Sequence, residues 1–430
     1  MEKLFKLRAH GVTVRGEIVA GVTTFLTMAY ILAVNPGMLG SIEGMEAGAV
    51  FTATAISSAI ATIMMALYAN LPIALAPGMG LNAFFTYTVV FGMGYPWQTA
   101  LTAVFLEGIL FIILSLVNVR ELIIKAIPNN LKKAVAVGIG LFIALIGFDN
   151  SGVIVGDAGT LVGLGDITAG APLVALLGLI IITVLYALKV PGSILIGIIL
   201  TTILGIPFGV TNVPEGWTPF SLPAAPLLFK FEFSQVLTFK FFTVFFTFLF
   251  VDIFDTIGTL VGVTTQAGLI KKNNEIPNVK QALLSDAVGT VAGAALGTST
   301  VTSYVESTAG VAVGGRTGLT ALITGILFLA ALFLSPLFLL IPSAATAPAL
   351  VIVGFFMIRT VTDINFTDPT EGIPAFFTIL MMPLAFSVAE GIVYGILAYV
   401  LLKTVSGKLR DISAVTWVLF VIFVLRFFLH

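Results

Sequence analysis

The stretch T-S-Y-V-E-S-T-A-G-V, residues Thr302–Val311, places the carboxyl group of Glu306 within some of the most apolar sequence of a 430-residue chain. Two further acids, Asp252 and Asp255, interrupt the apolar run Phe239–Val263 in the same way. A carboxylate at membrane depth costs about 2.5–3.5 kcal/mol on insertion scales, so it is expected to face a protein interior or a wet cavity. We therefore interpret these acids as parts of a solute-binding site inside a membrane protein.

The composition of the whole chain supports this interpretation. Hydrophobic residues make up 58% of the sequence and charged residues 10%, whereas soluble domains have about 25% charged residues. The net charge of −1 argues against a nucleic-acid partner, and no Cys and only two His argue against disulfides and against a thiolate or His metal centre. No metal or other cofactor is expected. No cleavable signal peptide is evident, because the basic N-terminal residues precede a span long enough to cross the bilayer.

Apolar runs of about 20 residues, the length that crosses a bilayer, follow one another along almost the whole chain. We predict fourteen spans, several of them short or interrupted by Gly and Pro, and a further apolar stretch, Ile412–Leu429, that either crosses the membrane or lies in its interface. The first seven predicted spans are Gly16–Val34, Ala47–Ala69, Pro72–Gly92, Trp97–Val117, Leu131–Phe148, Pro172–Leu188 and Gly192–Pro207. The second seven are Phe239–Val263, Gln281–Leu296, Thr300–Val313, Gly318–Leu340, Ala345–Ile358, Ile373–Ser387 and Gly391–Leu402.

Basic residues orient these spans by the positive-inside rule. With the N-terminus in the cytoplasm, the loops on that side hold nearly all of the Lys and Arg residues. The opposite side has only Lys230 and Lys240, and its loop Asp149–Ala171 is purely acidic. We expect a multi-pass protein of the plasma (cell inner) membrane with a cytoplasmic N-terminus and the lipid bilayer as its surroundings.

The two sets of seven spans resemble each other. The triplet T-F-L occurs at Thr24–Leu26 in the first span and at Thr247–Leu249 in the eighth, and the same offset carries Asn82 onto Val305, beside Glu306. Because seven is odd, the second set must cross the membrane in the opposite direction. The sequence predicts an all-α polytopic membrane protein built as a 7+7 inverted repeat, in which substrates bind near the midplane at interrupted helices.

Two of the spans contain such interruptions. The third holds A-P-G-M-G-L-N-A-F-F (Ala76–Phe85), where Pro removes a backbone donor and Gly disfavours the helix. The tenth holds G-T-S-T-V-T-S-Y (Gly297–Tyr304), rich in hydroxyl and β-branched residues. Freed backbone groups at membrane depth are tolerated where they line a cavity. We predict two short extended segments that lead into half-helices and cross near the bilayer centre; the alternative for the first is a simple packing kink.

The candidate binding and proton-coupling residues surround these interruptions. An ionised Glu306 accepts two hydrogen bonds from a planar ligand with adjacent N–H groups; the alternatives are an ion pair with Arg316 or a protonated acid used in packing. Asp252 and Asp255, three residues apart on one helical face, disfavour double ionisation, which suits proton coupling; the alternative is purely structural hydrogen bonding. Glu306 is the third proton-coupling candidate. The other substrate-binding candidates are Asn82, Thr259 and the rings of Phe84, Phe85 and Tyr304.

The runs that carry these residues resemble a known family. Three of them are similar to the AzgA-like purine permeases of the nucleobase:cation symporter-2, or nucleobase–ascorbate transporter, superfamily: G-V-T-V-R-G-E-I-V-A-G-V-T-T-F-L-T-M-A-Y-I-L-A-V-N-P (Gly11–Pro36), Ala76–Phe85, and F-V-D-I-F-D-T-I-G-T-L-V-G (Phe250–Gly262). The segment Thr302–Gly310 is similar to the T-x-Y-x-E-N-x-G pattern of the uracil-permease relatives. The likeness extends over essentially the whole chain.

This resemblance implies a uracil-permease-like fold divided into a core domain and a gate domain, and the gate domain of such proteins is often the surface of a homodimer. It implies a cytoplasmic N-terminal segment (1–15), two core segments (16–117 and 239–340), two gate segments (118–207 and 341–404), an extracellular linker (208–238) and a C-terminal hydrophobic segment (405–430). Asp255 aligns with the substrate-binding acid of the uracil-permease relatives, Thr259 replaces their coupling His, and Ser307 replaces an Asn, which disfavours uracil or xanthine.

The sequence-based hypothesis is a secondary active transporter, not an enzyme, that imports the purine nucleobases hypoxanthine, guanine and adenine by proton symport. One alternative is an anion exchanger or channel of the same fold, which Glu306 and the two aspartates disfavour. Another is a uracil/xanthine permease. An intramembrane protease is disfavoured because Asp252 and Asp255 lie too close on one helix for a dyad contributed by two helices.

Overall fold

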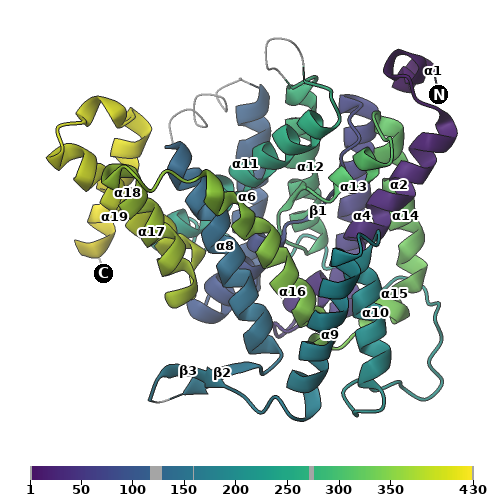
Figure 1. Cartoon of the computed structure of the whole chain (residues 1–430). Helices are drawn as coiled ribbons and strands as arrows, with labels where there is room; N and C mark the ends of the chain where they lie inside the picture. Colours follow the sequence, from purple (N-terminus) through teal and green to yellow (C-terminus); the bar gives the residue numbers. More distant parts are fainter. Residues whose placement is uncertain (1, 117–127, 158, 271–275, 429–430) are drawn as a thin grey trace.

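The structure, a computed structural model, describes residues 2–116, 128–157, 159–270 and 276–428 (Figure 1). Helices form almost all of its regular structure. Within the described residues, nine helices are long and apolar enough by composition to cross a membrane, and shorter apolar helices accompany them. Each of the fourteen predicted spans coincides with one or more observed elements, so the predicted helical membrane fold is confirmed.

The first half of the chain begins with a short helix, and two of its spans are interrupted. The helices are α1 (Glu2–Phe5), α2 (Val14–Met28), α3 (Ile31–Leu39), α4 (Ala47–Met64), α5 (Met79–Ala83), α6 (Trp97–Leu116), α8 (Asn129–Asn150), α9 (Gly170–Ala187) and α10 (Ser193–Gly205). The strands are β1 (Leu75–Pro77) and the hairpin β2 (Ile154–Asp157) and β3 (Leu161–Leu164); π-helical segments cover Met65–Ala69 and Phe84–Gly92.

The second half has the same alternation of long and interrupted helices. Its elements are α11 (Phe239–Gln266), α12 (Val279–Leu296), β4 (Val301–Ser303), α13 (Ser307–Ala312), α14 (Gly318–Ala331), α15 (Ser335–Leu339), α16 (Ser343–Ile358), α17 (Pro369–Leu384), α18 (Val388–Val405) and α19 (Ala414–Phe428). Side chains at the N-caps start several of these helices: the Thr238, Asp368 and Ser387 oxygens each accept a hydrogen bond from a backbone N–H of the first turn.

The first predicted span differs from the structure in its continuity. It was expected as one helix, Gly16–Val34, but the chain leaves the helix at Ala29 and Tyr30 and resumes as α3, which runs on past Pro36 to Leu39. Local sequence gives no break signal there, since neither residue is Gly or Pro. The Tyr30 side chain, at this interruption, is fully buried.

The two predicted extended segments meet as an antiparallel pair of strands. Leu75 lies opposite Ser303 and Pro77 opposite Val301, and the Gly78 N–H extends the pairing by donating to the carbonyl of Thr300 at 2.9 Å. Side chains satisfy the remaining backbone groups: the Thr62 hydroxyl, for example, accepts from the Leu75 N–H at 2.9 Å. Such pairing is required because unpaired backbone groups at membrane depth cost several kcal/mol each. β1 leads into the half-helix α5 and β4 into the half-helix α13, as predicted.

The hydroxyl-rich run before α13 connects this crossing to five helices. Alternating side chains leave the strand on different sides, so each hydroxyl reaches a different neighbour, and all of these groups are buried. The pairs are Thr298 with Asn35 of α3 (2.8 Å), Ser299 with Asn82 of α5, Thr300 with Glu107 of α6 (3.3 Å), Thr302 with Thr256 of α11 (2.8 Å) and Ser303 with Asp286 of α12 (3.3 Å).

The long helices pack as two groups. In the first, α12 packs on α4 and α6, and α14 packs on α2 and α4; in the second, α8 packs on α16 and α17, α9 on α10 and α16, and α17 on α18. Figure 1 shows α17 and α18 on one side of the molecule and α2 and α14 on the other. The first group contains spans one to four and eight to eleven, and the second contains the rest. This grouping agrees with the expected core and gate, whose boundaries stay predictions.

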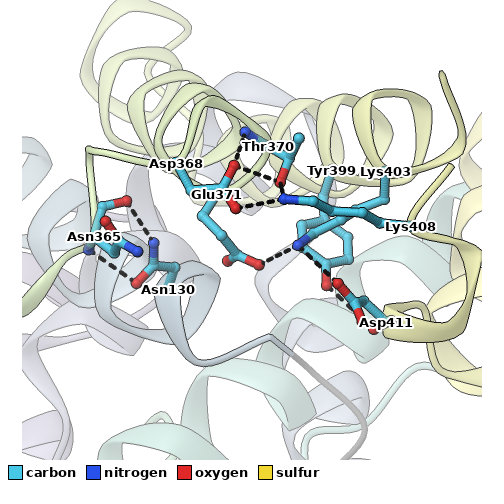
Figure 2. Close-up of polar contacts among 9 residues, drawn as sticks. All are labelled: Asn130, Asn365, Asp368, Thr370, Glu371, Tyr399, Lys403, Lys408 and Asp411. Atoms are coloured by element: carbon cyan, nitrogen blue, oxygen red, sulfur yellow. Dashed lines mark hydrogen bonds and ion pairs between the residues drawn. The ribbon is translucent and has the colours of Figure 1, made fainter. Parts of the chain in front are cut away.

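A charged network ties one end of the second group together (Figure 2). The Lys403 ammonium of α18, which is 3% exposed, lies 2.7 Å from a Glu371 carboxylate oxygen of α17 and 3.3 Å from Asp411, in the turn before α19. Lys408 pairs with Asp368 at 2.8 Å closer to the surface. These contacts fix α17, α18 and the start of α19 relative to one another.

Candidate functional site

Glu306 lies directly after β4, at the start of the half-helix α13. Its carboxylate oxygen Oε1 accepts a hydrogen bond from the Tyr30 hydroxyl at 2.6 Å, and its backbone carbonyl lies 3.4 Å from the Thr27 hydroxyl. Gly310 makes this approach of α13 to α2 feasible, because a Cβ there would overlap the Thr24 hydroxyl. Because Gly310 has no side chain, α13 can lie close to α2, and the Glu306 carboxylate can accept from the Tyr30 hydroxyl although the two residues are far apart in the sequence.

The predicted alternative for Glu306, an ion pair with Arg316, is wrong. The Arg316 guanidinium donates instead to the backbone carbonyls of Val311 and Gly315, at 2.6 and 2.7 Å, near the C-terminal end of α13. A cation there is favourable because the last carbonyls of a helix carry partial negative charge. Glu306 and Arg316 therefore stand at opposite ends of the same short helix.

Asp255 approaches Glu306 from α11. Its Oδ2 atom is 3.8 Å from the position that a Cβ on Gly78 would occupy, so its carboxylate lies beside the junction of β1 and α5. Asp255, Glu306, Tyr30 and Tyr304 are all within electrostatic reach of one another. We call these four residues the central cluster. They come from the α2–α3 break, from α11 and from the end of β4, so the cluster exists only where the interrupted elements meet.

Asp252 faces a different set of groups, although it is only one turn from Asp255. It is fully buried, and the Thr256 hydroxyl lies 3.5 Å from its Oδ1 and 2.9 Å from Oδ2 of Asp286 on α12. Asp252 therefore belongs to the polar contacts between α11, α12 and β4. The mutual coupling that the spacing of the two aspartates predicts stays a prediction.

The remaining predicted residues support the crossing. The Asn82 amide accepts from Ser299 and donates to the Pro77 carbonyl at 3.4 Å. The Tyr304 hydroxyl donates to that same carbonyl at 2.6 Å, so Tyr304 both joins the central cluster and braces β1.

The two predicted phenylalanines pack against a third aromatic ring. Phe84 and Phe85 are fully buried, and their ring centroids lie 4.9 and 6.4 Å from that of Phe248 on α11. Thr259 is buried on α11 one turn after Asp255. The two phenylalanines therefore contribute to ring packing, and the polar groups of the site are those of the central cluster.

Sequence reasoning missed two residues near this site, Tyr30 and Glu17. Glu17 of α2 is fully buried, and its carboxylate accepts from the backbone N–H of Arg316 at 2.8 Å and from the Thr317 and Thr320 hydroxyls at 2.7 and 2.8 Å. It satisfies the free donors at the start of α14, which is what the first turn of a helix requires. Neither role has a local signal, because both partners lie nearly 300 residues away in the sequence.

Known proteins share both the sequence and the architecture. A sequence profile of the permease family matches residues 15–394. The guanine/hypoxanthine permease PbuG of Bacillus subtilis is 46% identical over 99% of this chain and 99% of its own length, and the adenine permease AdeQ of Escherichia coli is 44% identical over 100% and 96%.

Among solved structures, the transmembrane domain of the cyanobacterial bicarbonate transporter BicA superposes with a TM-score of 0.65. It is 18% identical, and the match covers 89% of this chain and 97% of that domain. That likeness shows the fold alone, a multi-pass helical membrane architecture. Together with the full-length sequence matches, the interrupted spans and the buried acids, it leads to one conclusion: the chain belongs to the permease family, the nucleobase:cation symporter-2 group that its motifs resemble.

Proposed function

We propose that the protein is a secondary active transporter that imports the purine nucleobases hypoxanthine, guanine and adenine by proton symport. Permeases move solutes and are not enzymes. The observation that carries the proposal is that Asp255 of α11 and Glu306 at the start of α13 lie within electrostatic reach of each other in the central cluster, beside the crossing of β1 and β4. PbuG and AdeQ, whose names specify guanine, hypoxanthine and adenine, support the choice of purines.

The chemistry of the central cluster suits a flat base that carries N–H groups. Carboxylate oxygens accept hydrogen bonds from such donors, and the charge strengthens these bonds. Asp255 and Glu306 would hold two edges of the base, with Tyr304 and Thr259 lining the site. Asn82, Phe84 and Phe85 would keep β1 and α5 in place behind it.

The same two acids provide a reason for proton coupling. Two carboxylates that are close together in a low-dielectric interior repel each other when both are ionised. A proton bound by the pair removes that repulsion, so a proton and a base would enter together from the outside. Asp252, in its separate polar contacts with Thr256 and Asp286, is the third candidate carrier.

Transport would require the second helix group to move against the first around the central cluster, as in other inverted-repeat carriers. In this proposal the first group is the core domain and the second the gate domain. The protein would lie in the plasma membrane with its N-terminus in the cytoplasm, and two copies would meet through their gate domains. In Figure 1 the N-terminus and the β2–β3 hairpin lie at opposite ends of the molecule, which agrees with the acidic hairpin loop facing outward.

An anion exchanger of the same fold is the competing function, because BicA carries bicarbonate. An anion would have to bind beside two acids. None of the ion pairs formed by the described residues involves Asp255 or Glu306, so their negative charge would oppose it. The site thus favours a neutral base with N–H donors.

Uptake into proteoliposomes tests the proposal. Purified protein should accumulate radiolabelled hypoxanthine when the outside is made acidic, and bicarbonate should not compete. Glu306→Gln should lower uptake at limiting substrate by at least tenfold, because a hydrogen bond to a charged group contributes about 1.5–3 kcal/mol.

The matched control is Glu43→Gln, the same change at an exposed acid, which should transport like wild type. Uptake that does not depend on the pH gradient would contradict proton symport. Absence of purine uptake would contradict the proposed substrate.

A further inference from the structure

Tyr30 is fully buried and places its phenol on the acid that the proposed function assigns to the substrate. Its hydroxyl donates to Oε1 of Glu306 at 2.6 Å, a length typical of a strong O–H···O⁻ bond. At neutral pH a phenol keeps its proton and serves as the donor. The bond therefore takes one of the two lone pairs of Oε1 before any ligand arrives.

The surrounding contacts hold this bond in one geometry. Tyr30 is 0% exposed and lies at the break between α2 and α3, so its ring cannot turn into solvent. The Thr27 hydroxyl lies 3.4 Å from the backbone carbonyl of Glu306, and α13 presses onto α2 at Gly310. The acid and the phenol are therefore fixed on both sides.

We propose, on the basis of the proposed function, that Tyr30 is a positioning residue that sets which purines the site distinguishes. Because Oε1 already accepts from Tyr30, it binds a second N–H of a ligand more weakly than a carboxylate oxygen without such a donor would. Tyr30 does not need to touch the purine in order to have this effect.

The purines differ in the number of N–H donors that they present to such an acceptor. Guanine presents a ring N–H and an adjacent amino group on one edge, whereas hypoxanthine presents only the ring N–H there. A carboxylate with both oxygens available favours guanine through a second charge-assisted hydrogen bond. A carboxylate whose Oε1 already accepts from Tyr30 gains less from the second N–H, so it discriminates less between the two bases. Tyr30 thus widens the specificity of the site.

Tyr30→Phe tests this because it keeps the ring and removes the hydroxyl. The measurement is the KM for guanine and for hypoxanthine uptake into proteoliposomes. The ratio of the hypoxanthine KM to the guanine KM should rise about tenfold, the value of one hydrogen bond to a charged group. The maximal rates for the two bases should change together.

Tyr87→Phe is the matched control. The Tyr87 hydroxyl accepts a hydrogen bond from Asn150 at 2.6 Å, outside the central cluster. The variant loses a phenol contact of similar length, and its KM ratio should equal that of wild type.

Three outcomes separate the possibilities. Equal changes of both KM values in Tyr30→Phe would show a merely structural role and overturn the inference. If Tyr30→Phe does not fold, wild type still decides: a wild-type protein that prefers guanine over hypoxanthine tenfold or more would also overturn it. Wild type that transports neither base would instead remove the proposed function itself.

Discussion

At Gly78, the absence of a side chain allows β1 and β4 to lie against each other. A Cβ at this position would lie 2.6 Å from the Thr302 side-chain methyl group, well inside van der Waals contact. The backbone φ of −71° is ordinary, so the requirement is for space and not for an unusual conformation. The same residue separates the crossing strands from the Asp255 carboxylate. One small residue therefore serves both the fold and the site.

Gly78→Ala should destabilise the protein and weaken transport. Overpacking of this kind costs about 1–3 kcal/mol, because Thr302 belongs to a buried strand and has little room to shift. The apparent melting temperature in detergent should fall, and purine uptake should fall with it.

Gly37→Ala provides the comparison for this change. Gly37 lies within α3, and no atom lies within 4 Å of an added Cβ. Because Ala favours helix over Gly by up to about 1 kcal/mol, this variant should be as stable as wild type or slightly more stable. A Gly78→Ala protein as stable as Gly37→Ala would contradict the close-approach argument.

At the scale of elements, the packing of α17, α18 and α19 at one end of the second group depends on a buried lysine. Lys403 is held by Glu371 from α17 and Asp411 from the turn before α19, and its ammonium also lies 5.4 Å from the Tyr399 ring centroid. A buried charge is tolerated only when it is paired and hydrogen-bonded. The network therefore specifies how α17, α18 and α19 fit together.

Lys403→Met should lower the apparent melting temperature strongly, because it leaves two acids without their cation. Breaking a fully buried pair by removing one partner costs about 3–5 kcal/mol, and the cost here should be smaller because the Glu371 and Asp411 side chains are 22% and 54% exposed. The double variant Lys403→Met/Glu371→Met should recover much of the loss, since the more buried acid is removed as well.

Lys408→Met is the control at the same end of the molecule. Its pair with Asp368 is much more exposed, at 42% and 30%, and exposed pairs contribute about 0–1 kcal/mol. Thermal unfolding followed by fluorescence checks all three variants. Equal losses for Lys403→Met and Lys408→Met would show that burial of Lys403 is not what matters.

At the scale of the whole molecule, the two helix groups meet in part at small residues. Gly80 of α5 packs against Ile139 of α8, and Gly192, just before α10, packs against Leu26 of α2. Small residues at such contacts permit one group to slide past the other. The proposed transport cycle requires this movement.

A disulfide between positions 26 and 192 should stop transport reversibly. A Cβ on Gly192 would lie 3.4 Å from the Leu26 Cβ, close to the usual Cβ separation of about 3.5–4.5 Å in disulfides. The chain has no native cysteine, so Leu26→Cys/Gly192→Cys would form the one disulfide present. Oxidation should abolish purine uptake, and reductant should restore it.

The single variant Gly192→Cys is needed beside the pair, because Gly192 has a φ of 72° and a side chain there is strained on its own. It should be insensitive to oxidation. Full uptake by the oxidised, cross-linked pair would mean that the two groups do not move relative to each other at this contact.

The sequence by itself determined the membrane class, the spans, the two extended segments and the presence of buried acids. These follow from short-range rules: run length, Pro and Gly interruptions, and the cost of charge in lipid. The crossing of β1 and β4 was predictable for the same reason, since both interruptions occupy equivalent places in the two halves.

The tertiary structure alone decided the partners of each polar group. It broke the first span at Tyr30, paired that phenol with Glu306, placed the Thr256 hydroxyl beside Asp252, and packed Phe84 against Phe248. Each of these contacts is set by how closely two backbones approach, which depends on residues such as Gly78 and Gly310 that lie far from their partners in the sequence. Local pattern fixes which side chains are costly to bury, and only three-dimensional packing fixes which group compensates each of them.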